Sequence, residues 1–238
     1  MSRKIQGASL TSSRVLMVAA LTCGFWFSSS VWTAAVAADA PATVDDLVSA
    51  LQRRYQDIET LQAKFTQIST SLAMGEVKSK GKVQVAKPRK ARWETMGANA
   101  SLFVTDGTKM SIYTPAMNQV MVMNDMSSAG GGSADIMGLL QDLSKLDEQF
   151  EVTMRPDDSA AESHVVVDAV PRKPGGYSKI RLEFDRKSLD LARVVFSDSM
   201  GGTTDLRFAD LKLDVKIGDD AFQFTAPEGV TVIDGGAL

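Results

Sequence analysis

The chain has 238 residues, of which 44% are hydrophobic and 23% charged, and this ordinary globular composition excludes disordered, collagen-like and coiled-coil chains. The 26 basic and 29 acidic residues give a net charge of −3, so a nucleic-acid partner is not expected. With one Cys and one His, most metal sites and most cysteine or histidine catalysis are excluded as well.

The N-terminus has the pattern of a secretory signal peptide. Three basic residues precede an apolar stretch over residues 15–27, and small residues follow as far as Ala35-Val36-Ala37. This stretch is too short to cross a bilayer, so we predict cleavage after Ala37 rather than a membrane anchor. The predicted mature domain, residues 38–238, keeps 23 basic and 29 acidic residues, a net charge of −6. Cys23 falls in the leader, so a disulfide is not expected.

Two amphipathic helices are expected. Apolar residues from Val44 to Ile58 recur on one helical stripe, and Thr43 is a natural N-cap. After a Gly/Ser-rich segment over residues 127–133, a second stripe from Ile136 to Leu146 predicts a helix within residues 134–150.

Elsewhere the hydrophobic period is two, which predicts about eleven short strands separated by turn signals. The expected segments are 61–66, 77–85, 92–96, 101–105, 109–113, 119–124, 149–154, 163–170, 178–185, 191–197 and 203–215, with a short final piece at 222–225. Tight turns between neighbours leave no room for parallel crossovers. The pattern therefore predicts an antiparallel barrel or half-barrel in a single domain.

The sequence contains no convincing catalytic or metal-binding motif. His164 continues an alternating strand pattern, which is typical of a structural residue. Ser79 and Lys82 match the letters of an S-x-x-K motif but lie in a strand-like run. We predict neither an enzyme nor a bound metal or cofactor, although a glycosidase, which needs only two carboxylates, stays open.

Methionine is concentrated in one region. Six lie within 28 residues, namely Met110, Met117, Met121, Met123, Met126 and Met137. Methionine fills ordinary cores, but it is also common on surfaces that accept varied apolar partners. Residues 120–123 are apolar on both strand faces, which favours a strand between a cavity and a covering element.

Several segments carry, in order, a resemblance to a known family. They are Leu61-Gln62-Ala63-Lys64-Phe65-Thr66-Gln67, Gly81-Lys82-Val83, Lys87-Pro88-Arg89-Lys90-Ala91-Arg92-Trp93-Glu94, Val104-Thr105-Asp106-Gly107, Tyr113-Thr114-Pro115 and residues 222–230. Their order and spacing resemble the LolA family, the periplasmic carriers of outer-membrane lipoproteins in Gram-negative bacteria. The resemblance extends from about Leu47 to Ile233.

The resemblance implies a mainly β fold with some α, an unclosed antiparallel β-barrel whose helices form a lid over an apolar cavity. It implies a monomeric periplasmic carrier that takes triacylated lipoproteins from an inner-membrane ABC transporter and delivers them to an outer-membrane receptor. A lipid-binding or sensor module on the same half-barrel, with another amphiphilic ligand, stays open as an alternative.

On this scaffold, strand alternation and the helical stripes predict a lipid-binding cavity. We expect it to be lined by Phe65, Trp93, Phe103, Met110, Ile112, Met121, Met123, Phe184 and Phe208 and capped by Leu47, Leu51, Leu140 and Leu143.

The chain departs from the family pattern at two positions. Lys87 replaces an arginine that in the family hydrogen-bonds the backbone of the lid, so Lys87 is the expected latch, without the planar fork of arginine. Ala91 replaces an aromatic residue, which is expected to widen the cavity mouth or to reduce contact with the lid.

Overall fold

The computed structural model describes residues 41, 43–73, 75–124, 133–155, 163–173 and 176–235. The predicted signal peptide, Met126 and residues 127–132 of the Gly/Ser-rich segment lie outside these ranges. Among the helices that fall within them, none is long and apolar enough to cross a membrane.

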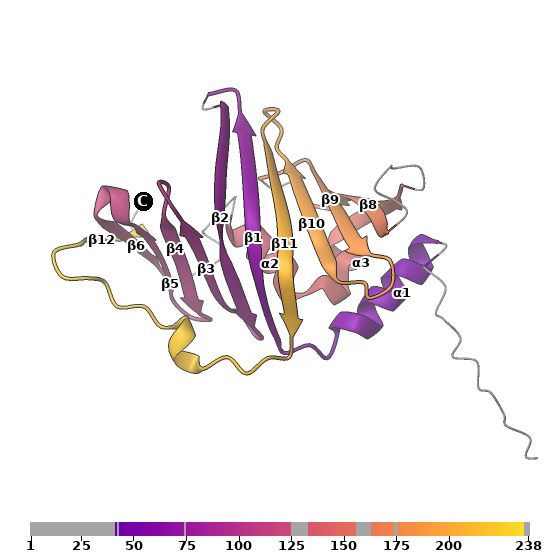
Figure 1. Cartoon of the computed structure of the whole chain (residues 1–238), viewed down its shortest axis with the longest axis horizontal. Helices are drawn as coiled ribbons and strands as arrows, with labels where there is room; N and C mark the ends of the chain where they lie inside the picture. Colours follow the sequence, from indigo (N-terminus) through magenta and orange to yellow (C-terminus); the bar gives the residue numbers. More distant parts are fainter. Residues whose placement is uncertain are drawn as a thin grey trace, which may run out of the picture. The chain divides into compact units, whose positions relative to one another are not determined.

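The described strands form one sheet (Figure 1). The strands are β1 (Thr60–Ser71), β2 (Gly75–Ala86), β3 (Lys90–Met96), β4 (Ser101–Asp106), β5 (Met110–Thr114), β6 (Gln119–Met123), β7 (Phe150–Met154), β8 (His164–Pro171), β9 (Lys179–Asp185), β10 (Leu191–Ser197), β11 (Thr203–Leu213) and β12 (Thr231–Asp234). Their order is β12-β6-β5-β4-β3-β2-β1-β11-β10-β9-β8-β7, so the sheet is an unclosed, largely antiparallel meander.

Two predictions about the strands are wrong. The described sheet has twelve strands, close to the number expected, but β12 pairs with β6 in parallel, whereas only antiparallel pairs were expected. A parallel neighbour is possible because a long connection joins β11 to β12, so no tight turn restricts the direction. The piece expected as a strand at residues 222–225 is not a strand: Phe222 ends the 3-10 helix η4 (Asp219–Phe222), and residues 223–225 have no regular secondary structure.

The first helix, α1 (Val44–Tyr55), begins where the sequence predicts. The Thr43 hydroxyl accepts a hydrogen bond from the Asp46 backbone nitrogen at 3.1 Å, which caps the helix. Leu47, Leu51 and Tyr55 are buried. The stripe was expected to reach Ile58, but the helix ends at Tyr55 because the following residues turn into β1.

The second predicted helix is interrupted. It consists of α2 (Ser133–Gln141), η3 (Leu143–Lys145) and α3 (Leu146–Gln149). The break lies at Asp142, which has a φ of −147° and a ψ of 63° and whose carboxylate accepts a hydrogen bond from the Ser144 hydroxyl. Short polar side chains of this kind compete with helical hydrogen bonds, which explains a stop inside a continuous apolar stripe.

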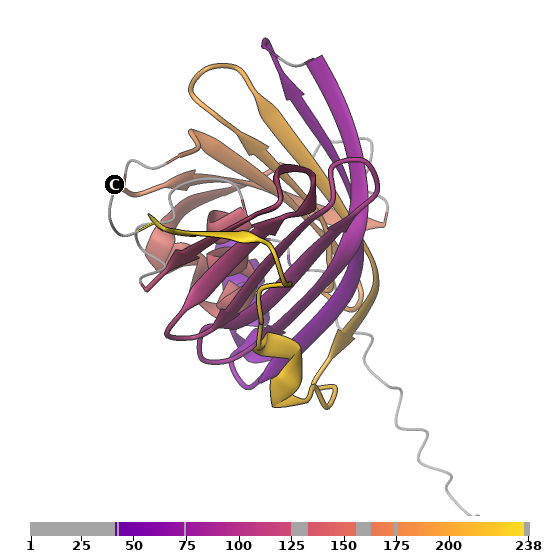
Figure 2. The ribbon, with the colours of Figure 1, turned by 90° about the vertical axis from the view of Figure 1, so that its left-hand side faces the viewer.

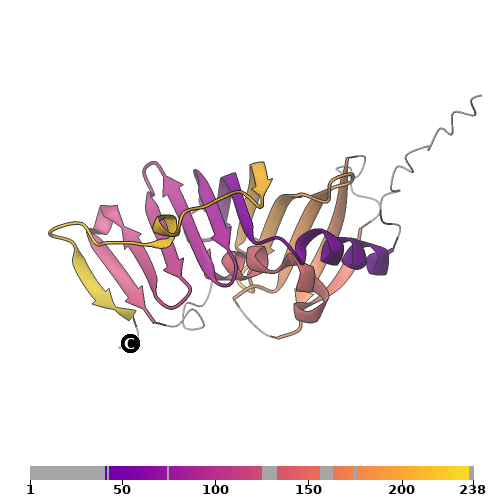
Figure 3. The ribbon, with the colours of Figure 1, turned by 90° about the horizontal axis from the view of Figure 1, so that it is seen from below.

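The helices lie on one face of the sheet, and the sheet curves around them (Figures 2 and 3). We call this face concave and the other convex. The upper end of the sheet, at the top of Figure 1, carries the β1–β2, β3–β4, β5–β6 and β10–β11 turns. The lower end carries the β2–β3, β4–β5 and β9–β10 turns.

The convex face of β7 to β11 is crossed by ion pairs. Asp168 pairs with Arg181 at 2.9 Å and with Arg155 at 3.1 Å, and Arg193 bridges Glu183 at 2.7 Å and Asp205 at 2.8 Å. Partial burial works against ionisation of Asp168, but hydrogen bonds from Arg181 and Arg155 outweigh it and lower the pKa of this carboxyl. The charges therefore stabilise the side of the sheet that has no helical cover.

Candidate functional site

An open cavity of ≈ 570 Å³ lies at the upper end of the sheet. Its polar lining includes Gln67, Ser69, Ser71, Ser79, Thr95, Ser101, Thr203 and Thr204, and its apolar lining includes Val77, Trp93, Ile136, Tyr177 and Phe196. The volume is that of a typical small-molecule site. The lining also includes Asp198, whose carboxylate accepts hydrogen bonds from the backbone nitrogens of Met200 and Gly202, and a mixed lining of this kind suits an amphiphile.

The residues predicted to line and cap the cavity lie together, but they fill the concave face rather than border open space. Ten of them are buried in one continuous core, namely Leu47, Leu51, Phe65, Trp93, Phe103, Met110, Met123, Leu140, Leu143 and Phe184. Ile112, Met121 and Phe208 are half-buried against this core. Of the predicted set, Trp93 alone borders the open cavity. The apolar faces of the sheet and of the helices bury each other.

An aromatic pair marks the boundary between the filled core and the open cavity. The rings of Phe65 and Trp93 stack with centroids 4.0 Å apart. The Phe65 ring packs directly over Gly81, where any β-carbon would collide with it. Gly81 is therefore needed for the close approach of this ring to the backbone of β2.

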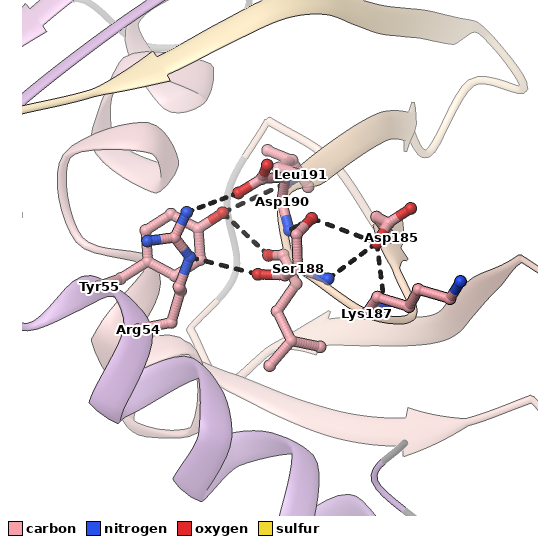
Figure 4. A network of polar contacts seen from close by, with 8 residues as sticks. Arg54, Tyr55, Asp185, Lys187, Ser188, Asp190 and Leu191 are labelled. Atoms are coloured by element: carbon pink, nitrogen blue, oxygen red, sulfur yellow. Dashed lines mark hydrogen bonds and ion pairs between the residues drawn. The ribbon is translucent and has the colours of Figure 1, made fainter. Parts of the chain in front are cut away.

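The C-terminal end of α1 is fixed to the β9–β10 turn (Figure 4). The Tyr55 hydroxyl donates to the Leu189 carbonyl at 3.0 Å and accepts from the Leu191 backbone nitrogen at 3.2 Å. Arg54 donates to the Ser188 carbonyl at 3.2 Å and pairs with Asp190 at 2.9 Å. Burial raises the pKa of Tyr55, so the hydroxyl stays protonated and can donate.

Lys87 contacts the same end of α1 from the other side. Its Nζ donates to the Tyr55 carbonyl at 3.1 Å and to the Gln56 carbonyl at 3.2 Å. These carbonyls lie at the C-terminus of the helix, where the dipole favours a cation. Partial burial works against ionisation of Asp142, next to η3, but hydrogen bonds from Lys145 and Ser144 and the charges of Lys145 and Lys87 outweigh it and lower the pKa of this carboxyl. Lys87 thus lies between the two helical segments.

The packing at this junction is imperfect. The side-chain nitrogen of Gln141, at the end of α2, is buried and has no hydrogen-bond partner among the described residues. A buried donor without a partner costs about 1–3 kcal/mol.

Two other predicted positions have no direct part in this site. Ala91 is fully buried near the lower end of β3, away from the cavity, so it does not widen the mouth. His164 is half-buried at the start of β8, 2.9 Å from the Ser163 hydroxyl. In the described part of the chain, no group of three or more His, Cys, Asp or Glu side chains is placed to hold a metal ion.

Arg54 and the hydroxyl of Tyr55 were not predicted as anchors of the helix. Tyr55 is part of the apolar stripe, but its partners lie 134 and 136 residues away, so periodicity gives no signal for them. The hydroxyl-rich lining of the cavity was also missed, although Gln67, Ser69 and Ser71 continue the inward-facing row of β1 beyond its apolar part.

Comparisons with known proteins agree with this architecture. A family model described as "Outer membrane lipoprotein carrier protein LolA" matches residues 56–225. An outer-membrane lipoprotein carrier protein of Methylibium petroleiphilum is 30% identical over 205 residues, covering 85% of this chain and 97% of that protein. Another, of Dechloromonas aromatica, is 31% identical over 180 residues, covering 75% and 83%.

Among solved structures, an uncharacterized conserved protein from Thermus thermophilus matches with a TM-score of 0.52 at 12% identity. The match covers 80% of this chain and 98% of that one. At this identity, the likeness concerns the fold alone.

Proposed function

Because this chain belongs to the LolA family of outer-membrane lipoprotein carrier proteins, we propose that it carries acylated lipoproteins between two membranes. The observation that carries the proposal is the apolar concave face, which is filled by core side chains and covered by short helices. A lid of this kind can separate from the sheet and offer both apolar surfaces to acyl chains.

The physical need for such a carrier is large. Moving a methylene group out of water is worth about 0.8 kcal/mol, so long acyl chains do not cross an aqueous compartment unshielded. In the proposed loaded state the acyl chains replace the contacts between lid and sheet. The hydroxyl-rich cavity at the upper end then receives the uncharged glyceryl and amide groups next to the chains.

We further propose the periplasm as the compartment, reached through cleavage of residues 1–37. The donor in this scheme is an inner-membrane lipoprotein-releasing ABC transporter, and the acceptor is an outer-membrane receptor. The protein acts as a monomer and needs no cofactor. Lys87, Arg54 and Tyr55 support this scheme as contacts that anchor one end of the lid to the sheet.

A loading assay tests the proposal. The purified protein is mixed with a detergent-solubilised triacylated lipoprotein, or with the same lipoprotein lacking acyl chains, and the detergent is then diluted. We expect a soluble complex on size-exclusion chromatography only with the acylated form. Complexes of equal yield from both forms would contradict an acyl-chain carrier.

The lid is tested with two matched substitutions. Leu140 is buried in α2, whereas Val232 is exposed on β12. Leu140→Glu places a charge on the apolar surface that acyl chains must contact, so loading should fall at least tenfold, while Val232→Glu should load normally. Full loading by a folded Leu140→Glu variant would show that α2 does not contact cargo.

A further inference from the structure

The upper end of the sheet exposes large apolar side chains at its turns. Leu72 in the β1–β2 turn is 94% exposed, Met200 in the β10–β11 turn 80%, Met117 in η1 (Pro115–Met117) 69%, and Met96 at the end of β3 37%. We call these four the tip residues. Among the described residues, six large apolar side chains are exposed, and four of them are tip residues.

The lower end is different. Its turns contain Lys87-Pro88-Arg89, residues 106–109 and residues 185–190, all rich in charged or polar side chains. The large apolar residue of the β9–β10 turn, Leu189, is half-buried against the core instead of exposed. The difference between the two ends therefore does not follow from turn structure in general.

The β10–β11 turn is built to present its methionine. The Asp198 carboxylate accepts hydrogen bonds from the backbone nitrogens of Met200 at 2.8 Å and Gly202 at 2.7 Å. Gly201 has a φ of +84°, which a side chain would disfavour. The turn is held from inside, and the methionine points away from the protein.

Two of the turns that carry tip residues, those of Leu72 and Met200, border the opening of the cavity. Ser71 and Gly75, which flank the β1–β2 turn, line the cavity, and so do Gly202 and Thr203 on the β10–β11 turn. Figure 1 shows these two hairpins projecting side by side at the upper end. Whatever the tip residues contact is therefore also adjacent to the cavity opening.

Basic side chains accompany the tips, although the predicted mature chain carries a net charge of −6. On the convex face of β2, the exposed Lys78 and Lys80 lie in the half of the strand next to the β1–β2 turn, where Lys78 also pairs with Glu76 at 3.1 Å. At the same end, Lys173 follows β8 and Lys179 begins β9. Apolar side chains at the tips of turns, with lysines further along the strands, are the arrangement expected of a surface that binds an anionic membrane.

We propose that the upper end of the sheet docks on the surface of an anionic phospholipid bilayer, with the tip residues inserted among the headgroups and Lys78 and Lys80 facing the phosphates. A bilayer is favoured over a protein partner because the apolar residues stand on separate turns. A fluid surface accepts scattered insertions, whereas a protein interface requires a contiguous, complementary patch. Docking in this orientation places the cavity opening against the membrane.

The first test is flotation of the purified protein, without lipoprotein, with vesicles of phosphatidylethanolamine and phosphatidylglycerol. We expect co-flotation that weakens with salt and is absent with phosphatidylcholine vesicles. The double variant Leu72→Ser/Met200→Ser should bind at least tenfold more weakly. The control Val232→Ser removes an apolar side chain that is 57% exposed but lies in strand β12 instead of a turn, and it should bind normally.

A second pair of variants tests the charges. Lys78→Gln/Lys80→Gln should reduce binding about 30-fold, since each lysine near an anionic surface is worth roughly a factor of five. Lys109→Gln/Lys187→Gln removes the same charge from turns at the lower end and should bind normally. These residues are exposed or lie in turns, so circular dichroism and thermal unfolding should show native folding in every variant.

The proposal is overturned if the wild type does not float with anionic vesicles, or if the tip variant floats as well as the wild type. It is also overturned if vesicle binding is never seen and the tip variant instead loses binding to a protein. The assay contains no cargo, so its outcome is independent of the loading assay. A protein that loads lipoprotein but ignores vesicles would keep the proposed function and lose this inference.

Discussion

Replacing Lys87 by methionine tests whether its two hydrogen bonds fix the C-terminal end of α1 to the sheet. The ammonium donates to the carbonyls of Tyr55 and Gln56 at 3.1 and 3.2 Å, and methionine keeps a comparable chain length without a donor. A hydrogen bond to a charged group contributes about 1.5–3 kcal/mol. Since Lys87 is half-buried and its ammonium is rehydrated on opening, we assign about 1.5–3 kcal/mol to both bonds together.

Amide hydrogen exchange in α1 measures this energy locally. A loss of about 1.5–3 kcal/mol corresponds to roughly a ten- to hundredfold rise in the population in which the C-terminal end of α1 is detached from the sheet. The amides of Leu51 to Gln56 should therefore exchange faster by about that factor in Lys87→Met, because they exchange through local opening. Amides of β1 and β2 should keep their protection, because the sheet does not depend on this contact. Lys87→Arg should protect α1 at least as well as lysine does.

The matched control is Lys90→Met. Lys90 belongs to the same end of the sheet, but it pairs with Asp219 at 2.6 Å and not with α1. It should leave the exchange of α1 unchanged. The reasoning is refuted if Lys87→Met leaves α1 protection intact, or if protection falls equally in α1 and in the sheet, which would indicate a general loss of stability.

Three further predictions concern stability. Gly81→Ala should lower the free energy of unfolding by about 1–3 kcal/mol in urea titrations, because the new methyl group would collide with the Glu94 carbonyl oxygen of β3 and with the Phe65 ring; an unchanged midpoint would contradict this close packing. Gln141→Met should raise it by about 1 kcal/mol and slow lipoprotein loading, because it removes a buried donor without a partner; a less stable variant would imply a partner for that donor. Asp168→Asn should lower it by about 1–3 kcal/mol at pH 7. The pKa of Asp168 is lowered in the folded state, so the wild type should lose this contribution as the pH falls below about 4. The free energy of unfolding of the variant should change less over the same pH range.

Much of the sheet could be predicted from the sequence, because alternation in β1 and β2 reports directly which residues face inward. Strand β12 could not, since the alternation in Thr231–Asp234 carries no information about its partner or its direction. The break at Asp142 was missed for a related reason. The apolar stripe continues through it, and only the local competition from the Asp142 and Ser144 side chains ends the helix.

The residues of the candidate site could be predicted from the sequence, but whether they surround an open cavity or fill a core could not. Alternation places Phe65, Trp93 and Phe103 on the concave face whether that face is hollow or filled. The sequence therefore identifies the inward residues, while the closing of helices over them depends on contacts between distant segments. Arg54 and Tyr55 illustrate this, because their partners in the β9–β10 turn lie far away along the chain.

The positions of the polar anchors indicate how the lid opens. Arg54, Tyr55 and Lys87 all act on the last turn of α1. The segment that follows is also fixed, since the Lys87 backbone nitrogen donates to the Glu59 carbonyl at 2.9 Å. The C-terminal end of α1 is therefore the pivot, and its N-terminal part, which packs through Leu47 and Leu51, is the part that swings.

This pivot can be tested with spin labels on two exposed positions of α1 and its end, Ser49 and Gln56, each paired with a label at Thr108 on the lower end of the sheet. On loading with lipoprotein, the distance from Ser49 should change clearly more than the distance from Gln56, because displacement grows with distance from a hinge. Adding Tyr55→Phe, which removes the hydroxyl that contacts Leu189 and Leu191, should increase the movement at Gln56 specifically. Equal displacement of both positions in the unmodified protein would mean that α1 leaves as a rigid unit and that the anchors form a latch instead of a hinge.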